Sequence, residues 1–298
     1  MSVVSIDSLA GAAHERERAC CAVLERGDVL LFPETPFALS LEDRALLLKQ
    51  RLTEAGYHKN IAYRPGADRV TGVARQQSED AEKLRRVLSA YSRAVVEFAS
   101  RLLPRYASRW RLDFASFRPQ EEAGRKLSVH SRNDLLHVDS FPTRPTSGDR
   151  IFRVFTNVNP QAPRLWRTGE GFEELAERFA DSSGLLAKAT RSSLARTVAS
   201  AARRAGLPVR VRPPYDEFML RFHHFLKENG SYQENARAEQ ISFPPGSTWM
   251  VFTDMVTHSV LSGQFALEQT FLIARESLFF PERAPIAVLE RLAGRALA

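Results

Sequence analysis

The sequence is poor in cysteine and contains no long apolar run. Its two cysteines, Cys20 and Cys21, are adjacent in a chain of 298 residues. This spacing fits neither a disulfide framework nor a zinc site, so we expect two reduced structural residues. No apolar stretch approaches the ~20 residues that span a bilayer, and charged residues follow the N-terminus before a signal-peptide core could form. These absences predict a cytoplasmic protein.

Internal repeats and low-complexity tracts are also absent, which argues against a solenoid or a disordered tail. Glycine and proline are dispersed, and hydrophobic residues make up 44% of the chain. This composition is typical of a globular protein whose length allows a sizeable core.

Positive charge is in excess, with 42 lysines and arginines against 35 acidic residues and a formal net charge of +7. The excess is compatible with nucleic acid, a phosphorylated or carboxylated substrate, a membrane surface, or simply a basic solvated surface. The sequence has no RNA-recognition, KH or zinc-finger signature, and its basic residues are spread along the chain. A basic nucleic-acid-binding protein is therefore an alternative from another class, and we expect no nucleic-acid partner.

The first third of the sequence predicts a helical layer. Helical spacing of apolar residues extends over residues 8–26, 40–55 and 77–107, and Ser40 is the expected N-cap of the second helix. Between the first two helices, the apolar residues 29–33 predict a short buried strand that proline closes.

Later segments predict an α+β fold with a barrel or two-sheet jelly roll. Short strands are predicted at Lys126–His130, Leu135–Ser140, Arg150–Asn157, Gln240–Phe243, Ser247–Thr253, Ser259–Leu261 and Ala266–Ala274. We interpret residues 1–298 as one domain, with jelly-roll strands at about 124–160 and 238–278 and a helical insertion at about 164–233 that can cap the barrel. The helices of this insertion are expected at Glu170–Phe179, Ser182–Ala205 and Asp216–Glu228.

Residues 285–298 predict a C-terminal amphipathic helix with Ile286, Leu289, Leu292 and Leu297 near one face. That face can pack on the protein itself or on a bilayer. The few cations in the segment favour packing on the protein.

A candidate metal site lies in the strand segments. His137 and Asp139 are two positions apart, so a strand would point both side chains to one face. His258 follows the Pro244–Gly246 turn and an apolar strand, and a late strand can return to face an early one. Two imidazoles and one carboxylate form the ligand set of non-heme iron(II) oxygenases, which leaves three positions open. A histidine and an aspartate at this spacing often occur by chance, and only the surrounding strands favour the metal hypothesis.

The other histidines are weaker ligand candidates. His223 and His224 lie among apolar residues of a predicted helix, where burial or exposure explains them. His130 remains a candidate for contact with the substrate or with a ligand. We expect no catalytic residue beyond the metal ligands.

Three segments together match a known pattern: SRNDLLHVDSFPTRP at residues 131–145, YDEFMLRFH at 215–223, and the stretch from Pro244 through His258 to Gln269. Over most of its length the chain resembles the Kdo hydroxylase family. The resemblance implies a double-stranded β-helix (jelly-roll) fold and an iron(II)-dependent hydroxylase that consumes O2 and oxidises 2-oxoglutarate to succinate and carbon dioxide. It further implies hydroxylation of the Kdo sugar at C3, giving Ko, on lipid A at the cytoplasmic face of the inner membrane.

The distal carboxylate of 2-oxoglutarate needs a buried cation, and the guanidinium fork of arginine is suited to this role. Related dioxygenases usually supply it from the strand after the distal histidine, where this sequence has Gln269. The nearest arginine on that strand is Arg275. We therefore favour Arg153 assisted by Gln269 and keep Arg275 as a further candidate.

The anionic sugar would require cations beside the metal segment. Arg132, Asn133, Arg144 and Arg150 flank that segment and are the candidate substrate-binding residues. Peripheral contact with anionic inner-membrane lipid is a further expectation. The same chemistry on another small acid or lipid is the nearest alternative function, because the metal ligands do not identify the substrate.

Overall fold

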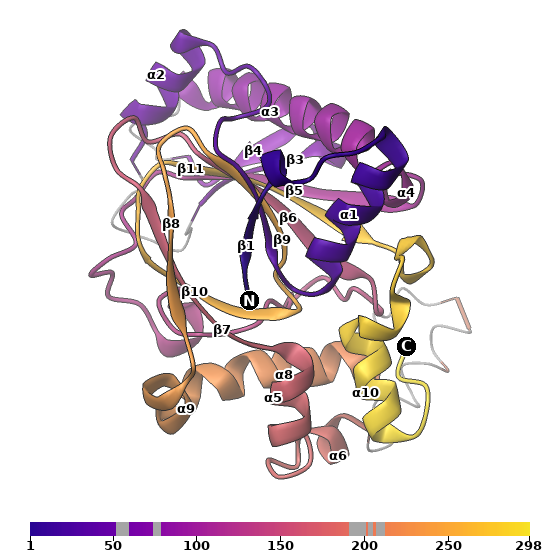
Figure 1. The fold of residues 1–298 in the computed structure, drawn as a ribbon. Helices are drawn as coiled ribbons and strands as arrows, with labels where there is room; N and C mark the ends of the chain where they lie inside the picture. Colours follow the sequence, from indigo (N-terminus) through magenta and orange to yellow (C-terminus); the bar gives the residue numbers. More distant parts are fainter. Residues whose placement is uncertain (52–59, 74–78, 191–200, 202–204, 207–211) are drawn as a thin grey trace.

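The structure, a computed structural model, describes residues 1–51, 60–73, 79–190, 201, 205–206 and 212–298. Its strands form an eight-stranded sheet of order β1-β2-β9-β6-β11-β5-β3-β4 and a three-stranded sheet of order β10-β7-β8 (Figure 1). The strands are β1 Val3–Ser5, β2 Val29–Phe32, β3 Ile61–Arg64, β4 Arg69–Thr71, β5 Trp110–Arg118, β6 Arg150–Asn157, β7 Arg164–Gly171, β8 Glu239–Phe243, β9 Thr248–Phe252, β10 Val256–Ser262 and β11 Ala266–Ile273. The helices are α1 Ala13–Glu25, α2 Leu41–Lys49, α3 Ala81–Leu102, α4 Pro104–Ala107, α5 Phe172–Phe179, α6 Leu185–Thr190, α8 Pro214–Glu228, α9 Gly230–Asn235 and α10 Pro285–Ala293.

The central strands have jelly-roll topology. In the larger sheet β5, β11, β6 and β9 are neighbours and all pair antiparallel. The smaller sheet gains a fourth, very short member, because His137 forms an isolated antiparallel bridge with His258 of β10. Four strands opposite four strands is the arrangement of a jelly roll, so the predicted α+β jelly-roll fold is confirmed.

Alternation along β6 divides the core into two layers. Phe152 and Val154 belong to the cluster that lies under the helices, whereas Phe155 belongs to the cluster between the sheets. Trp166 of β7 and Trp249 of β9 pack against Phe155, with ring centroids 5.0 and 5.2 Å away. Successive strand residues point to opposite faces, so β6 can build both layers.

The helical layer predicted for the first third of the chain is present. α1 and α3 cover the outer face of the larger sheet (Figure 1). Ser40 caps α2 as expected, because its hydroxyl accepts a hydrogen bond of 3.0 Å from the backbone N–H of Asp43. Parts of the predicted helices 40–55, 77–107 and 182–205 lie outside the described residues.

The strands differ from the predictions in four places. Leu135–Ser140 was expected to be a strand and forms only the isolated bridge at His137. Residues 126–130 form no strand and lead into a single 3-10 turn, Val129–Ser131. β5 was not anticipated, and β7 occupies the first eight residues of the expected helical insertion, which begins only at Phe172. β7 was missed because Arg164, Thr168 and Glu170 interrupt its apolar pattern, and these side chains are buried against partners that are distant in sequence.

The C-terminal helix packs on the protein itself. This is the alternative that the sequence analysis favoured, because the segment contains few cations. Ile286, Val288 and Leu289 of α10 are buried, and Arg291 pairs with Glu173 of α5 at 2.5 Å. The helix is shorter than predicted and ends at Ala293; the capping residue Gly294 has a φ of 64°, which glycine adopts easily. Among the described residues, no helix is both long and apolar enough to cross a membrane.

Candidate metal centre

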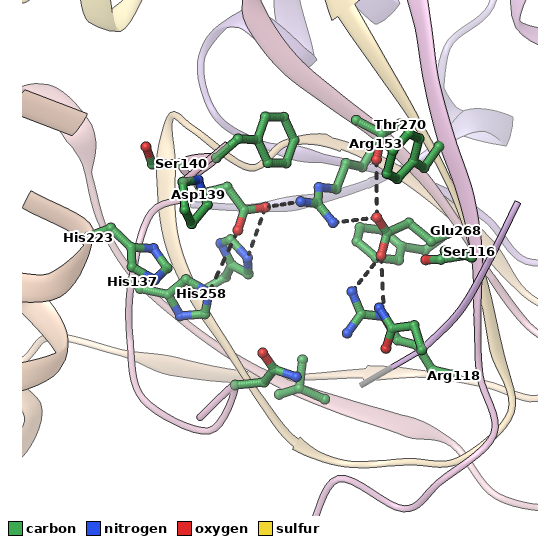
Figure 2. Close-up of a pocket in the computed structure, with 18 of the residues that line it drawn as sticks. Ser116, Arg118, His137, Asp139, Ser140, Arg153, His223, His258, Glu268 and Thr270 are labelled. Atoms are coloured by element: carbon green, nitrogen blue, oxygen red, sulfur yellow. Dashed lines mark hydrogen bonds and ion pairs between the residues drawn. The ribbon is translucent and has the colours of Figure 1, made fainter. Parts of the chain in front are cut away.

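Three side chains from distant parts of the sequence converge between the sheets (Figure 2). His137, Asp139 and His258 each offer a ligand atom, and these atoms all lie within 4.8 Å of one another. Nε2 of His137 is 3.7 Å from Oδ1 of Asp139, and Nε2 of His258 is 4.0 Å from Oδ2 of the same carboxylate. The structure thus brings together the three residues that the sequence analysis selected.

Backbone pairing sets this geometry. The N–H of His137 donates to the carbonyl of His258 at 3.1 Å, and the reverse hydrogen bond is 3.0 Å long. The N–H of Asp139 donates to the carbonyl of Thr253 at 2.8 Å. Because His137 and Asp139 are two positions apart in extended chain, both side chains point toward the same space.

Each histidine has the tautomer that a metal ligand requires. Nδ1 of His137 donates to the carbonyl of Leu135 at 2.7 Å, and Nδ1 of His258 donates to the carbonyl of Val256 at 3.1 Å. The Nε2 atoms therefore keep their lone pairs and face the cluster. Metal-binding histidines are commonly oriented by such second hydrogen bonds.

Burial and neighbouring charge favour the ligand forms of all three groups. Burial lowers the pKa of His137 well below its ordinary value, and burial likewise lowers the pKa of His258. Burial alone would raise the pKa of Asp139, but the guanidinium of Arg153, the two histidines and a hydrogen bond from Thr253 together outweigh burial, and the pKa is strongly lowered. Neutral imidazoles and an ionised carboxylate are the forms that bind a metal ion.

A chain of buried charges extends from Asp139 across the cavity (Figure 2). Arg153 pairs with Oδ2 of Asp139 at 2.9 Å and also pairs with Glu268. Glu268 in turn pairs with Arg118 at 2.6 Å. Burial would raise the pKa of Glu268, but the two arginines outweigh it and the pKa is lowered. Arg153 therefore links a candidate ligand to the opposite wall.

The three candidate ligands open onto a cavity of about 310 Å³. Phe114, Phe141 and Arg144 line it on one side, and His223 and Lys227 of α8 also face it. Arg118 and Glu268 lie across the cavity from the histidines (Figure 2).

Sequence reasoning missed several residues of the cavity wall, namely Arg118, Arg164, His223, Lys227 and Glu268. Arg118 and Arg164 lie on strands that the apolar pattern did not reveal. Lys227 could have been found, because it follows His223 by one helical turn and so shares its face of α8.

The comparisons with known proteins agree with this geometry. The family model described as 3-deoxy-D-manno-oct-2-ulosonic acid (Kdo) hydroxylase matches residues 9–296. The chain belongs to the Kdo hydroxylase family. No curated protein matches the chain.

Solved structures of the Kdo hydroxylase KdoO, a non-heme Fe(II) α-ketoglutarate-dependent dioxygenase, are similar to this family member over its full length. The KdoO complex with α-ketoglutarate and Fe(III) has a TM-score of 0.83 and 34% sequence identity, covering 100% of this chain and 98% of that chain. The KdoO complex with cobalt(II) has a TM-score of 0.83 and 35% identity, covering 99% of this chain and 97% of that chain. The resemblance seen in the sequence is confirmed.

Two of the residues considered for 2-oxoglutarate do not line the cavity of this Kdo hydroxylase family member. Gln269 points to the other face of β11, where its amide donates to the backbone carbonyls of Asp113, Phe114 and Thr270. Arg275 follows the end of β11 and pairs with Glu290 of α10 at 3.0 Å. Parity explains the first correction, because the neighbours Glu268 and Thr270 take the inward positions.

Of the candidate substrate-binding residues, some line the cavity and others do not. Asn133 and Arg144 line the cavity, and so does His130, whose imidazole also pairs with Glu228. Arg132 and Arg150 do not line the cavity, so the predicted role of these two residues in substrate binding is wrong. Arg132 pairs with Asp134 at 2.6 Å on the surface, and Arg150 is fully buried against Asp254 at 2.9 Å.

Proposed function

We propose that this chain hydroxylates a Kdo sugar with iron(II), 2-oxoglutarate and O2, and that His137, Asp139 and His258 hold the iron. The convergence of these three side chains in a member of the Kdo hydroxylase family is the observation that carries the proposal. Two imidazole nitrogens and one carboxylate oxygen suit iron(II) and leave coordination positions for cosubstrate and oxygen. The bound iron supplies the oxygen chemistry, and the chain supplies position and charge.

Arg153 orients the carboxylate ligand. Its guanidinium pairs with Oδ2 of Asp139, which leaves Oδ1 beside Nε2 of His137. A guanidinium at this position also keeps Asp139 ionised. Asp139 and Glu268 already pair with Arg153. This arginine is therefore a weaker candidate for binding 2-oxoglutarate than the sequence analysis suggested.

We place the distal carboxylate of 2-oxoglutarate at Arg164, because the carboxylate that pairs with it, Glu122, is 3.5 Å away, whereas Arg153 is held by both Asp139 and Glu268. Nε of Arg164 is buried without a hydrogen-bond partner. Burial, and after it the charge of Arg118, lowers the pKa of Arg164 to about 10. A lowered pKa means that the charged form of Arg164 is destabilised by burial and by the nearby charge of Arg118. An additional carboxylate would stabilise that charged form, so this position favours binding of one.

The sugar acid is expected beside Arg144, Asn133 and Lys227. The guanidinium of Arg144 lies 4.0 Å from the ring centroid of Phe114 and 4.5 Å from that of Phe141, which fixes a cation on the cavity wall. Lys227 contributes a second cation from α8. Two cations on different elements can hold the carboxylate of Kdo while hydroxyl groups contact Asn133.

We propose that the acceptor is Kdo attached to lipid A and that the protein meets it at the cytoplasmic face of the inner membrane. Arg144 supports an approach from outside, because its side chain is 33% exposed and also lines the cavity. A sugar can thus enter while its lipid remains outside the protein.

One incubation tests the function. Purified protein, iron(II), ascorbate, 2-oxoglutarate and Kdo-bearing lipid A are combined under air, and mass spectrometry should find one added oxygen on the sugar. His137→Ala, Asp139→Ala and His258→Ala should each abolish turnover, because each removes a ligand. His14→Ala changes an exposed histidine of α1 and should behave like the wild type. Full activity in any ligand variant, or oxygen on a different acid or lipid instead, would overturn the assignment.

A further inference from the structure

The segment that carries two of the three candidate ligands is an incomplete strand. Residues 135–139 pair with β10 through a single bridge and belong to no regular strand. In an extended antiparallel segment, alternate residues direct their N–H and C=O groups to opposite edges. His137 faces β10, so Leu136 and Val138 direct their backbone groups to the other edge. Within the part of the chain that the structure describes, the sheet supplies no strand at that edge.

The side-chain amide of Gln233, on the short helix α9, takes the place of the missing strand. Its Oε1 accepts from the N–H of Leu136 at 2.9 Å, and its Nε2 donates to the carbonyl of Leu136 at 2.9 Å. The same Nε2 donates to the carbonyl of Leu226 in α8 at 2.7 Å. One primary amide thus offers the donor and acceptor that a neighbouring peptide would offer.

The orientation of this amide is fixed by its partners. Two carbonyl oxygens can be satisfied only by the NH₂ end, and the N–H of Leu136 only by the oxygen. The reversed orientation would place oxygen against both carbonyls. Gln233 therefore ties Leu136, the residue before a candidate ligand, to two helices at once.

A second contact lies next along the same edge. Nδ1 of His223, in α8, donates to the carbonyl of Val138 at 2.7 Å. Leu136 and Val138 are both fully buried, so water cannot replace these partners. Together the two side chains attach the helices of the insertion to the edge of the ligand segment that faces away from β10.

We propose that Gln233 is a positioning residue for the metal centre, which acts by holding the backbone of Leu136 so that His137 and Asp139 keep their ligand geometry. The inference rests on the proposed assignment of the metal ligands. Gln233 is the better residue to test, because His223 also lines the cavity and can contact substrate.

The first experiment measures metal affinity without turnover. Metal-free protein is titrated with cobalt(II), whose absorption spectrum reports coordination. Gln233→Leu should raise the dissociation constant about 10- to 100-fold, as expected for loss of a residue that orients ligands. Gln264→Leu is the matched control, because Gln264 is also half-buried and donates to a backbone carbonyl, that of Pro119, outside the ligand segment. Equal affinity of Gln233→Leu and the wild type would overturn the proposal.

Hydrogen exchange separates this inference from the metal assignment. In metal-free protein, the amide of Leu136 should exchange faster in Gln233→Leu than in the wild type or Gln264→Leu. If the wild type binds no cobalt(II) but this difference is found, the metal assignment fails while the backbone contact stands. If Gln233→Leu does not fold, the isosteric Gln233→Glu replaces it, because a carboxylate cannot donate to the carbonyls of Leu136 and Leu226. Cobalt(II) affinity of Gln233→Glu equal to that of the wild type would likewise reject the proposal.

Discussion

At the scale of single residues, the candidate metal centre contains buried charges that are paired with charges of opposite sign. Asp139, Arg153, Glu268 and Arg118 alternate in sign along one line of contacts. Burial would raise the pKa of each carboxylate, but Arg153 together with the other neighbouring groups outweighs burial and lowers the pKa of both. Loss of one member removes a partner from each of its buried neighbours, which is more costly than loss of a surface pair.

Glu268 gives this arrangement a measurable dependence on pH. Its folded-state pKa lies below the ordinary value of 4.5, so its contribution to stability is complete above that pH and is lost as the pH falls through the folded pKa. We expect the free energy of unfolding of the wild type, measured in urea, to decrease below about pH 4.5, and to decrease less steeply in Glu268→Gln. Glu97→Gln, at an exposed glutamate, is the control. Parallel pH profiles for the wild type and Glu268→Gln would contradict this role.

Lys227 allows a test of the substrate side of the cavity. Lys227→Met should raise KM for the Kdo substrate about tenfold or more, because a partly buried lysine–carboxylate pair is lost, and should leave KM for 2-oxoglutarate unchanged. Steady-state kinetics with each substrate varied in turn measure both constants. Lys126→Met, at an exposed position, should change neither. An equal rise in both constants would show that Lys227 does not discriminate between the two ligands.

The sequence predicted the three candidate ligands that the structure brings together, but it did not predict the residues around them. His137 and Asp139 could be predicted because a spacing of two has a fixed meaning in extended chain. The sequence did not reveal that Arg164 lines the cavity or that Gln269 does not, since this depends on which face of each strand is inward. Only the register of β7 and β11 within their sheets decides that.

At the scale of elements, the turn between β9 and β10 is held by a buried ion pair. Arg150 at the start of β6 donates to Asp254 through Nε at 2.9 Å and Nη2 at 3.2 Å. The N–H of Ile151 donates to the same carboxylate at 3.2 Å. This turn lies between Thr253, which binds the backbone of Asp139, and the strand of His258. Arg150 thus has a structural role in place of the substrate role that its sequence position indicated.

Breaking the Arg150–Asp254 ion pair should destabilise the protein more than breaking an exposed ion pair. Arg150→Met leaves the carboxylate of Asp254 buried and unpaired, so we expect a loss of about 3–5 kcal/mol in the free energy of unfolding. The double variant Arg150→Met/Asp254→Leu should recover much of that loss. Arg111→Met breaks a pair whose arginine is 60% exposed, and should cost no more than about 1 kcal/mol. Urea denaturation measures these changes. If Arg111→Met and Arg150→Met lowered the free energy of unfolding by similar amounts, burial would not determine how much each ion pair contributes to stability.

Elements were predictable where their pattern is local. β6, β8, β9 and β11 follow their expected ranges closely, because apolar runs and turn residues bound them. The segment near His137 was expected to be a full strand and has only one bridge. Its other edge is completed by the side chain of Gln233, about a hundred positions later, and no local pattern can reveal such a partner.

At the scale of the whole molecule, two sets of helices surround the jelly roll. α1 and α3 cover the larger sheet, and α5, α8, α9 and α10 gather at the other end of the molecule (Figure 1). α8 brings His223 and Lys227 to the cavity, so the helical insertion contributes to the site as well as to the fold. The interpretation of residues 1–298 as one domain remains a prediction.

The C-terminal helix is expected to stabilise this assembly. Truncation after Arg283 removes the buried side chains of Ile286, Val288 and Leu289, and with them roughly 5 kcal/mol of apolar burial. It also removes the carbonyl of Leu297, which accepts from the N–H of Tyr215 in α8. Urea denaturation should therefore show a large loss of stability. If stability is unchanged and sedimentation with anionic vesicles is reduced, the helix serves membrane contact instead.

The most direct test of the account is an anaerobic titration with iron(II) in the presence of 2-oxoglutarate, followed by optical absorption of the complex. We expect one iron per chain in the wild type, and greatly weakened or no uptake in His137→Ala, Asp139→Ala and His258→Ala. Stoichiometric uptake with unchanged affinity in all three variants would contradict the central claim, because the iron would then lie elsewhere.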